Sequence, residues 1–488
     1  MNELYLLIRS LKNSEKRYFT LSCHTMVASK KSNYARLFEV LDGLTAYDEK
    51  AILLKYRKEP FAKNYAANKA YLYEMILASL RNYQEDSIEE WGIRRNFYKI
   101  KILASKGLDK QCEKLIIKTK AKAWQYEQYQ TLLDILDVEL YLFGNCRIGE
   151  MSKDLFWNLK SEKDTVIKIL TEYNQVQSAW HQINLLFANK LNEPFIEIQK
   201  QAERIINSLA LLNEPSPTHS LTVRNRYYAC FELYYNHIGN AKLCYTYNKQ
   251  LIDNRALIDI KMPNIAVDAM AVYFNYMVAC YKYQQWEQME VYLYKTLHYP
   301  TQSIEQQIRR THNYCYNGML LFLHTQQLDK AKDVVAIFEQ AKANFGEQYR
   351  VDFLLFTQAH VGWYYFLQNN IDKATTLWRE ILQGPKYTVE TRTQATTRFY
   401  LLIVYYLQKE EQLFHSELTN TKRYVKQHFL LGKSEALFLD TMAALQHDNS
   451  DTSLFKTLTE KLSKVVTTLT EKSVLNQFII NWLANRVN

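Results

Sequence analysis

The sequence predicts an all-α fold built from stacked helix pairs. Gly (11) and Pro (7) are scarce among the 488 residues, so little in the composition interrupts long helices. One short phrase recurs along the chain and carries the periodicity of a helix. The chain is also longer than one compact core usually becomes, yet no Gly/Ser-rich or Pro-rich linker divides it. These observations favour an extended array of similar helical units.

The recurring phrase marks the start of a helix. It reads "NNIDKATTLW" at 369–378, "QQLDKAKDVV" at 326–335 and, more distantly, "KGLDKQCEKL" at 106–115. Apolar residues follow at i, i+3, i+4 and i+7, which is one stripe of an α-helix. They are Ala374, Leu377, Trp378 and Ile381 in one copy and Ala331, Val334, Val335 and Phe338 in the other. We expect Asp372 and Asp329 to cap these helices, because a carboxylate there can accept from free amides.

A second amphipathic run precedes each copy, so the unit is helix, tight turn, helix. Small residues are expected where the two helices cross, and Gly362 with Ala374 and Gly318 with Ala331 fit this role. Two further units centre on Met289 and Ala241. The four anchors lie 48, 42 and 43 residues apart along the chain. Such a pair cannot bury its apolar face alone and must stack on its neighbours.

This pattern resembles the tetratricopeptide repeat over 222–390 and more weakly over 94–221 and 391–445, where HEAT-like or other α-solenoid pairs remain open. The resemblance rests on Gly362, Tyr365, Ala374, Trp378 and Pro385, with spacings longer than the usual 34 residues. It implies a right-handed superhelix of antiparallel helix pairs whose first helices line a concave groove. The positions that line the groove in tetratricopeptide repeats, transferred to this sequence, give a set of residues expected to bind a peptide or protein. The set is Arg226, Tyr234, Phe274, Tyr281, Tyr316, His324 and Trp363.

The two ends differ from the middle, which predicts three regions: a basic helical head at 1–93, the repeats at 94–445 and C-terminal capping helices at 446–488. The longest helix of the head is expected near 61–83. Its predicted buried stripe is Ala66, Ala70, Tyr73, Leu77 and Leu80, and the stripe expected to close the array is Leu475, Phe478, Ile479 and Trp482.

Positive charge is concentrated near the N-terminus. Residues 1–122 hold 24 Lys and Arg against 14 Asp and Glu, whereas the rest of the chain holds 37 of each. The predicted basic surface comprises Lys12, Lys16, Arg17, Lys55, Arg57, Lys58, Lys63 and Lys69 in the head and Lys106, Lys110, Lys114 and Lys118 after it. Such a surface either contacts a nucleic acid or an acidic partner, or is a solvated face; the four later lysines either meet an anion or are offset by acids on an adjacent helix.

No motif for catalysis, a metal or a cofactor stands out. The eleven histidines are never within four residues of one another, and no two glycines approach GxG spacing. The seven cysteines are dispersed, which indicates reduced thiols, and neither a signal peptide nor a membrane span is expected. We therefore expect a cytoplasmic, non-catalytic scaffold or adaptor without a cofactor, which binds a peptide or protein. The alternative is a transcriptional regulator with a nucleic-acid-binding head.

Overall fold

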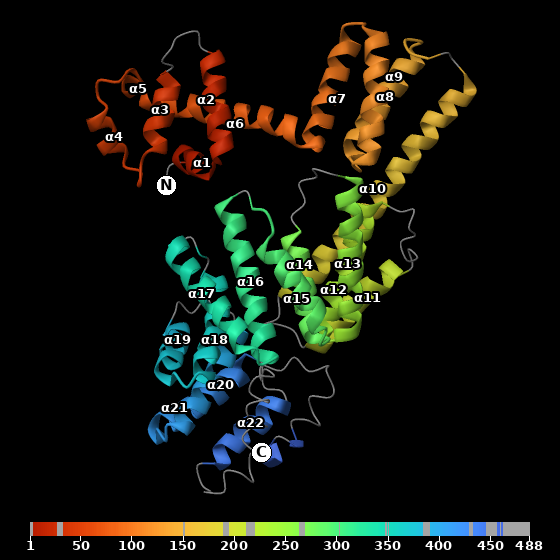
Figure 1. Cartoon of the computed structure of the whole chain (residues 1–488). Coiled ribbons are helices and arrows are strands. Elements are labelled where there is room, and N and C mark those ends of the chain that lie inside the picture. Colours follow the sequence, from red (N-terminus) through yellow and green to blue (C-terminus); the bar gives the residue numbers. More distant parts are fainter. Residues whose placement is uncertain are drawn as a thin grey trace. The chain divides into compact units, whose positions relative to one another are not determined.

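The computed structural model describes most of the chain, and every regular element in the described part is helical (Figure 1). The described residues are 3–26, 33–149, 152–188, 195–210, 220–262, 269–301, 303–346, 349, 351–383, 391–428, 433–445, 456–458 and 460–461. Two compact units are present. One comprises Met1–Tyr173 with Ala256–Val267, and the other comprises Asn174–Arg255 with Asp268–Asn488.

The first unit begins with a group of short helices and continues with longer ones. The elements are α1 (Glu3–Ser10), α2 (Asn13–Met26), α3 (Asn33–Asp42), α4 (Glu49–Lys55), α5 (Pro60–Lys63), α6 (Tyr65–Ser87), α7 (Glu89–Ser105), α8 (Asp109–Gln125), α9 (Tyr129–Gly144) and the first part of α10 (Lys153–Ala188). Buried apolar residues between Leu4 and Ile76 form one cluster, and those between Ile100 and Leu159 form another.

The predicted stripe of α6 is displaced by one position. The buried residues are Tyr65, Leu72, Ile76 and Ser79, whereas Ala66 and Ala70 are exposed and Leu77 is 39% exposed. Tyr73 and Leu80 of the predicted stripe are half-buried and do pack against the same core. Both sets have helical spacing, so periodicity alone does not separate them. The observed set buries Tyr65, Leu72 and Ile76, whose apolar area exceeds that of the two alanines, and burial of apolar area stabilises the fold.

The second unit contains the rest of α10 and the helices that follow, except that the end of α13, from Ala256 on, belongs to the first unit. These are α11 (Phe195–Ala210), α12 (Leu221–Ile238), α13 (Ala241–Lys261), α14 (Met270–Lys282), α15 (Trp286–Leu297), α16 (Ile304–His324), α17 (Leu328–Phe345), α18 (Val351–Leu367), α19 (Ile371–Gln383), α20 (Thr391–Leu407), α21 (Glu411–Gln427) and α22 (Lys433–Ala444). Consecutive helices pack together, and α14, α16, α18 and α20 also pack one against the next. The predicted stripes of α17 and α19 are buried, as expected.

The same tight turn recurs between paired helices. Each turn has one residue with positive φ, and the amide after it donates to the carbonyl five residues earlier at 2.8–3.0 Å. This is the Schellman arrangement, usually built on glycine. The positive-φ residues are Gly107, Glu127, Cys146, Gly239, Gln284, Gln326, Asn369 and Lys409. From Gly239 onward they lie 45, 42, 43 and 40 residues apart, so the repeat period extends through α20 and α21.

The predicted caps are wrong in position. Asn370, not Asp372, caps α19, since its Oδ1 accepts from the Lys373 amide at 3.3 Å. Asp329 lies within the first turn of α17, whose N-cap Gln327 makes no side-chain capping bond. Asp372 and Asp329 therefore face the positive end of each helix dipole from the first turn, where a carboxylate still stabilises the helix.

Small residues do permit close approach of helices, although through other neighbours than expected. A Cβ added at Gly362 would lie 2.4 Å from Nε1 of Trp378, and that indole donates to the Ala359 carbonyl at 2.9 Å. A Cβ added at Gly318 would lie 3.0 Å from Val334. The glycines thus accommodate side chains of the partner helix. The predicted partners Ala374 and Ala331 are fully buried in the same core.

The predicted C-terminal cap at 446–488 falls almost entirely outside the described residues, and Leu475, Phe478, Ile479 and Trp482 all do.

Candidate functional site

A strip of aromatic rings runs over three packed helices of the second unit, α14, α16 and α18, and also includes Trp286 at the start of α15. Seven of its side chains are half-buried and two are buried beneath them. We call this set the aromatic strip; its members are Phe274, Tyr281, Trp286, His312, Tyr316, His324, Phe353, Phe356 and His360. Four of them, Phe274, Tyr281, Tyr316 and His324, belong to the groove set predicted from the sequence.

The first ring cluster of the strip joins all three helices. The rings of His312 on α16 and Phe353 on α18 stack with centroids 4.1 Å apart and planes 5° apart. Phe274 on α14 stacks on Tyr316 at 5.6 Å, and Tyr316 contacts Phe356 at 4.5 Å. Rings in these arrangements hold one another in fixed orientations. The cluster therefore presents a pre-organised surface.

The second ring cluster lies farther along the same helices. Tyr281 meets Trp286 and His324 edge-on, each with ring centroids 5.8 Å apart, and Trp286 and His324 lie 4.3 Å apart. Seven residues separate Phe274 from Tyr281 on α14, which is about 10 Å of helix at 1.5 Å per residue. The two clusters thus extend the strip by roughly two helical turns.

Two histidines of the strip, His360 and His324, provide uncharged rings. Burial lowers the pKa of His360 to about 4, and its Nδ1 lies 3.0 Å from the Phe356 carbonyl. Burial also lowers the pKa of His324. Both imidazoles are therefore neutral near pH 7, because the unperturbed value is about 6.5. The strip consequently offers π faces and apolar area with little formal charge.

Three predicted groove residues lie outside the strip. Trp363 is only 1% exposed and packs against Phe366, Trp378 and Tyr400, so it is a core residue. Tyr234 is buried on α12. Arg226 places its guanidinium 4.6 Å from the ring centroid of Trp180, so its charge already faces an aromatic ring of the second unit.

Five members of the strip were not anticipated: Trp286, His312, Phe353, Phe356 and His360. Helix α18 reads "VDFLLFTQAHVGWYYFL", which is apolar around most of its circumference. A stripe is therefore not visible in its sequence, and only the i, i+3, i+7 spacing of Phe353, Phe356 and His360 hints at a shared face. His312 follows two arginines and carries no pattern that marks it.

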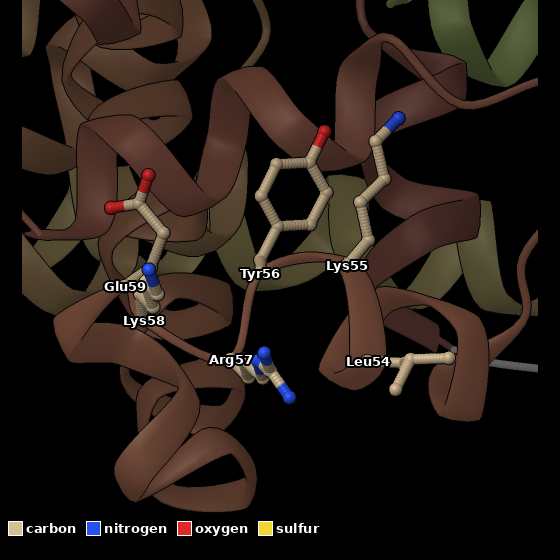
Figure 2. A pocket seen from close by; sticks show the side chains of 6 residues that line it. All are labelled: Leu54, Lys55, Tyr56, Arg57, Lys58 and Glu59. Atoms are coloured by element: carbon tan, nitrogen blue, oxygen red, sulfur yellow. The ribbon is translucent and has the colours of Figure 1, made fainter.

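The basic residues of the head do not converge on one point. Lys16 pairs with Asp42, and Lys69 pairs with Glu49 at 2.7 Å. Lys55, Arg57 and Lys58 are exposed around an open hollow of about 750 Å³ that Leu54, Tyr56 and Glu59 also line. Figure 2 shows the charged ends of these side chains pointing in different directions. Arg17 and Lys63 are exposed, and Lys12 is half-buried.

The four later lysines lie in a row on α8 and at the end of α7. Lys106, Lys110, Lys114 and Lys118 are all exposed, and none forms an ion pair with the residues that the structure describes. Like charges at i, i+4 destabilise a helix by about 0.2–0.5 kcal/mol a pair. The structure therefore favours an uncompensated row over one offset by acids on an adjacent helix.

Three buried cysteine thiols are poor nucleophiles. Burial raises the pKa of Cys230, Cys244 and Cys280 to about 12, so these thiols stay protonated near neutral pH. Within the described ranges, no three His, Cys, Asp or Glu side chains gather in a way that could hold a metal ion. No helix of the described part is long and apolar enough to cross a membrane.

Comparison with protein-family models, with curated proteins and with solved structures finds no match for the chain.

Proposed function

We propose that the protein is a non-catalytic interaction scaffold whose second unit binds a peptide or protein segment on the aromatic strip. The observation that carries this proposal is the set of half-buried rings that three packed helices bring into mutual contact. Rigid aromatic side chains supply large contact area at low entropic cost, and they dominate the binding energy of many interfaces. Because the strip carries little charge, we expect a partner segment rich in apolar, aromatic or proline residues.

The finer architecture belongs to the same proposal. We place the helices in antiparallel pairs that stack into a tetratricopeptide-like right-handed superhelix, with α14, α16 and α18 as first helices. The 40–45-residue period of the turns from Gly239 onward and the close fit of Gly362 to Trp378 support this arrangement. We also propose a cytoplasmic location, which agrees with seven free cysteines of which six are buried.

Site-specific photo-crosslinking in the native cell tests the proposal. A photoreactive residue at Phe274 or Tyr316 should capture a partner, whereas one at Tyr294, which is 66% exposed on α15, should not. Affinity for the captured segment should then fall on the order of tenfold in Phe274→Ala or Tyr316→Ala, as for interface anchors. Tyr294→Ala is the matched control and should change affinity little. Equal losses from all three variants would show that the strip is not the binding surface.

A second candidate function is nucleic-acid binding by the head. The exposed Lys55, Arg57 and Lys58 support it, whereas their divergent side chains and the pairing of Lys16 and Lys69 do not. We expect weak binding without sequence preference at most, with log affinity falling linearly in log salt. Gel retardation by the full chain and by a Lys55→Glu/Arg57→Glu/Lys58→Glu variant measures it. Retention of one duplex sequence at roughly 0.2 M salt by the wild type alone would promote this function over the scaffold.

A further inference from the structure

The lysine row of the first unit carries apolar side chains as well as charge. Leu108, in the turn before α8, is 43% exposed, and Ile117, on α8, is 63% exposed. We call Lys106, Leu108, Lys110, Lys114, Ile117 and Lys118 the lysine face. The lysines are four residues apart, so on α8 they repeat about every 6 Å. The face is therefore an amphipathic surface turned toward solvent.

Four of the acids around α8 pair with other cations of the same unit, and Glu113, half-buried on α8 three residues after Lys110, offsets at most one of the four lysines. Asp109 pairs with Arg147 at 2.6 Å, and Glu89 pairs with Lys122 at 2.6 Å. Glu139 and Glu162 both pair with Lys120 at 2.7 Å. Lys122 is the next residue of the row, at i+4 from Lys118, and its partner Glu89 marks where the unpaired part of the row ends. Positive charge on the lysine face thus remains available for an external anion.

We propose that the lysine face is a docking surface for an acidic amphipathic helix of a partner protein. Carboxylates four residues apart on such a helix match the lysine spacing, and its apolar stripe can cover Leu108 and Ile117. The face belongs to a helix whose interior amides and carbonyls are already paired. A helical partner also pairs its own backbone amides and carbonyls internally, so it needs no backbone partner on this face.

The apolar residues distinguish this partner from nucleic acid. Phosphates pair with lysine but gain nothing from Leu108 or Ile117, since binding to a nucleic-acid backbone is electrostatic. An acidic amphipathic helix uses both kinds of side chain. The inference concerns α8 of the first unit and does not depend on the aromatic strip of the second.

The test uses the full chain and a fluorescein-labelled designed peptide. The peptide carries Glu at four positions four residues apart beside a stripe of Leu, and fluorescence anisotropy measures binding. Lys110→Glu/Lys114→Glu should weaken binding about tenfold or more, because it replaces attraction by repulsion. Lys242→Glu/Lys249→Glu, at two exposed lysines of α13, is the matched charge control and should have little effect.

Ile117→Ser separates the candidate partners. The substitution should weaken binding of the peptide about threefold to tenfold, since one exposed apolar contact is lost. Binding of the same variant to a duplex DNA of equal charge and to phosphatidylserine vesicles is measured for comparison. Unchanged peptide affinity in Ile117→Ser overturns the proposal, as does tighter binding of the DNA or of the vesicles than of the peptide. Absence of saturable binding to the peptide also overturns it.

Discussion

Helices α7–α10 of the first unit and helices α14–α19 of the second are held together by different contacts. Between α8, α9 and α10, Lys120 bridges two glutamates, and the Trp124 indole donates to Glu162 at 2.8 Å. Between α18 and α19, the Trp378 indole instead fits over Gly362 in an apolar core. Charge pairs tolerate small displacements but respond to salt and pH, whereas close-packed rings respond to volume. The two regions should therefore fail under different perturbations.

The largest effect is expected from Gly362→Ala. The added methyl group would lie 2.4 Å from Trp378 Nε1, so the indole must move and its bond to Ala359 is lost. Overpacking and one unpaired buried donor together cost about 4 kcal/mol of unfolding free energy. Urea denaturation measures the loss.

Gly107→Ala is the control in the first unit. Gly107 has φ +68° with nothing within 4 Å of an added Cβ. Only the backbone conformation is then disfavoured, at about 1–2 kcal/mol. If Gly362→Ala and Gly107→Ala lower the free energy of unfolding equally, close packing of side-chain volume does not distinguish the α18–α19 contact from the first unit.

A buried carboxylate gives the second unit a pH dependence of its own. Burial raises the pKa of Glu232 on α12 to about 7, with Asn248 and Lys282 offsetting this in part. The folded chain therefore holds a proton that the unfolded chain releases above about pH 4.5, so this group's contribution falls as pH rises from about 4.5 to 7. In Glu232→Gln that slope is absent, and its stability relative to wild type should rise by about 3 kcal/mol between pH 4.5 and 8.

Paired unfolding curves of the two proteins at both pH values measure the difference. Groups such as His360 are common to both proteins and cancel. A constant offset between wild type and variant would place Glu232 in a solvated environment.

Lys120→Met tests the ion-paired region. Its side chain and that of Glu139 are each 14% exposed, so removing the cation leaves two carboxylates close together and partly desolvated. We expect a loss of about 2 kcal/mol, less than for a fully buried pair. Lys160→Met, in the exposed pair with Asp164, is the matched control on α10 and should cost less than about 0.5 kcal/mol. Equal effects would mean that the pairs of the first unit stabilise it no more than surface charges do.

Regular apolar spacing predicts correctly which face of a helix is buried when that helix also has a polar face. The stripes beginning at Ala331 and Ala374 are buried, as expected. Each lies on a helix, α17 or α19, whose opposite side is polar, so only one face of that helix can turn toward the core. On α6 two stripes compete, and side-chain size decided between them. Apolar α18 has no polar side, so its sequence does not distinguish the buried Trp363 from the half-buried Phe353 and Phe356.

The turns were harder to recognise from sequence. Most of their positive-φ positions hold residues other than glycine, and Gln284, Gln326 and Lys409 give no sign of a left-handed conformation, whereas Asn369 adopts it more readily. Only the pattern of hydrogen bonds identifies them as equivalent. The function of the aromatic strip and of the head stays a prediction, since contacts among rings do not identify the molecule that covers them.

The close pair of indoles in the second unit is an intrinsic spectroscopic probe. Trp363 and Trp378 are both fully buried with ring centroids 6.4 Å apart, whereas Trp157 of the first unit is 60% exposed. Two chromophores at that separation couple excitonically, and the ring of Tyr400 on α20 lies 4.7 and 4.9 Å from them. The near-ultraviolet circular dichroism of the folded chain should therefore contain a contribution from the packing of α18, α19 and α20, and loss of that contribution would report disruption of this packing.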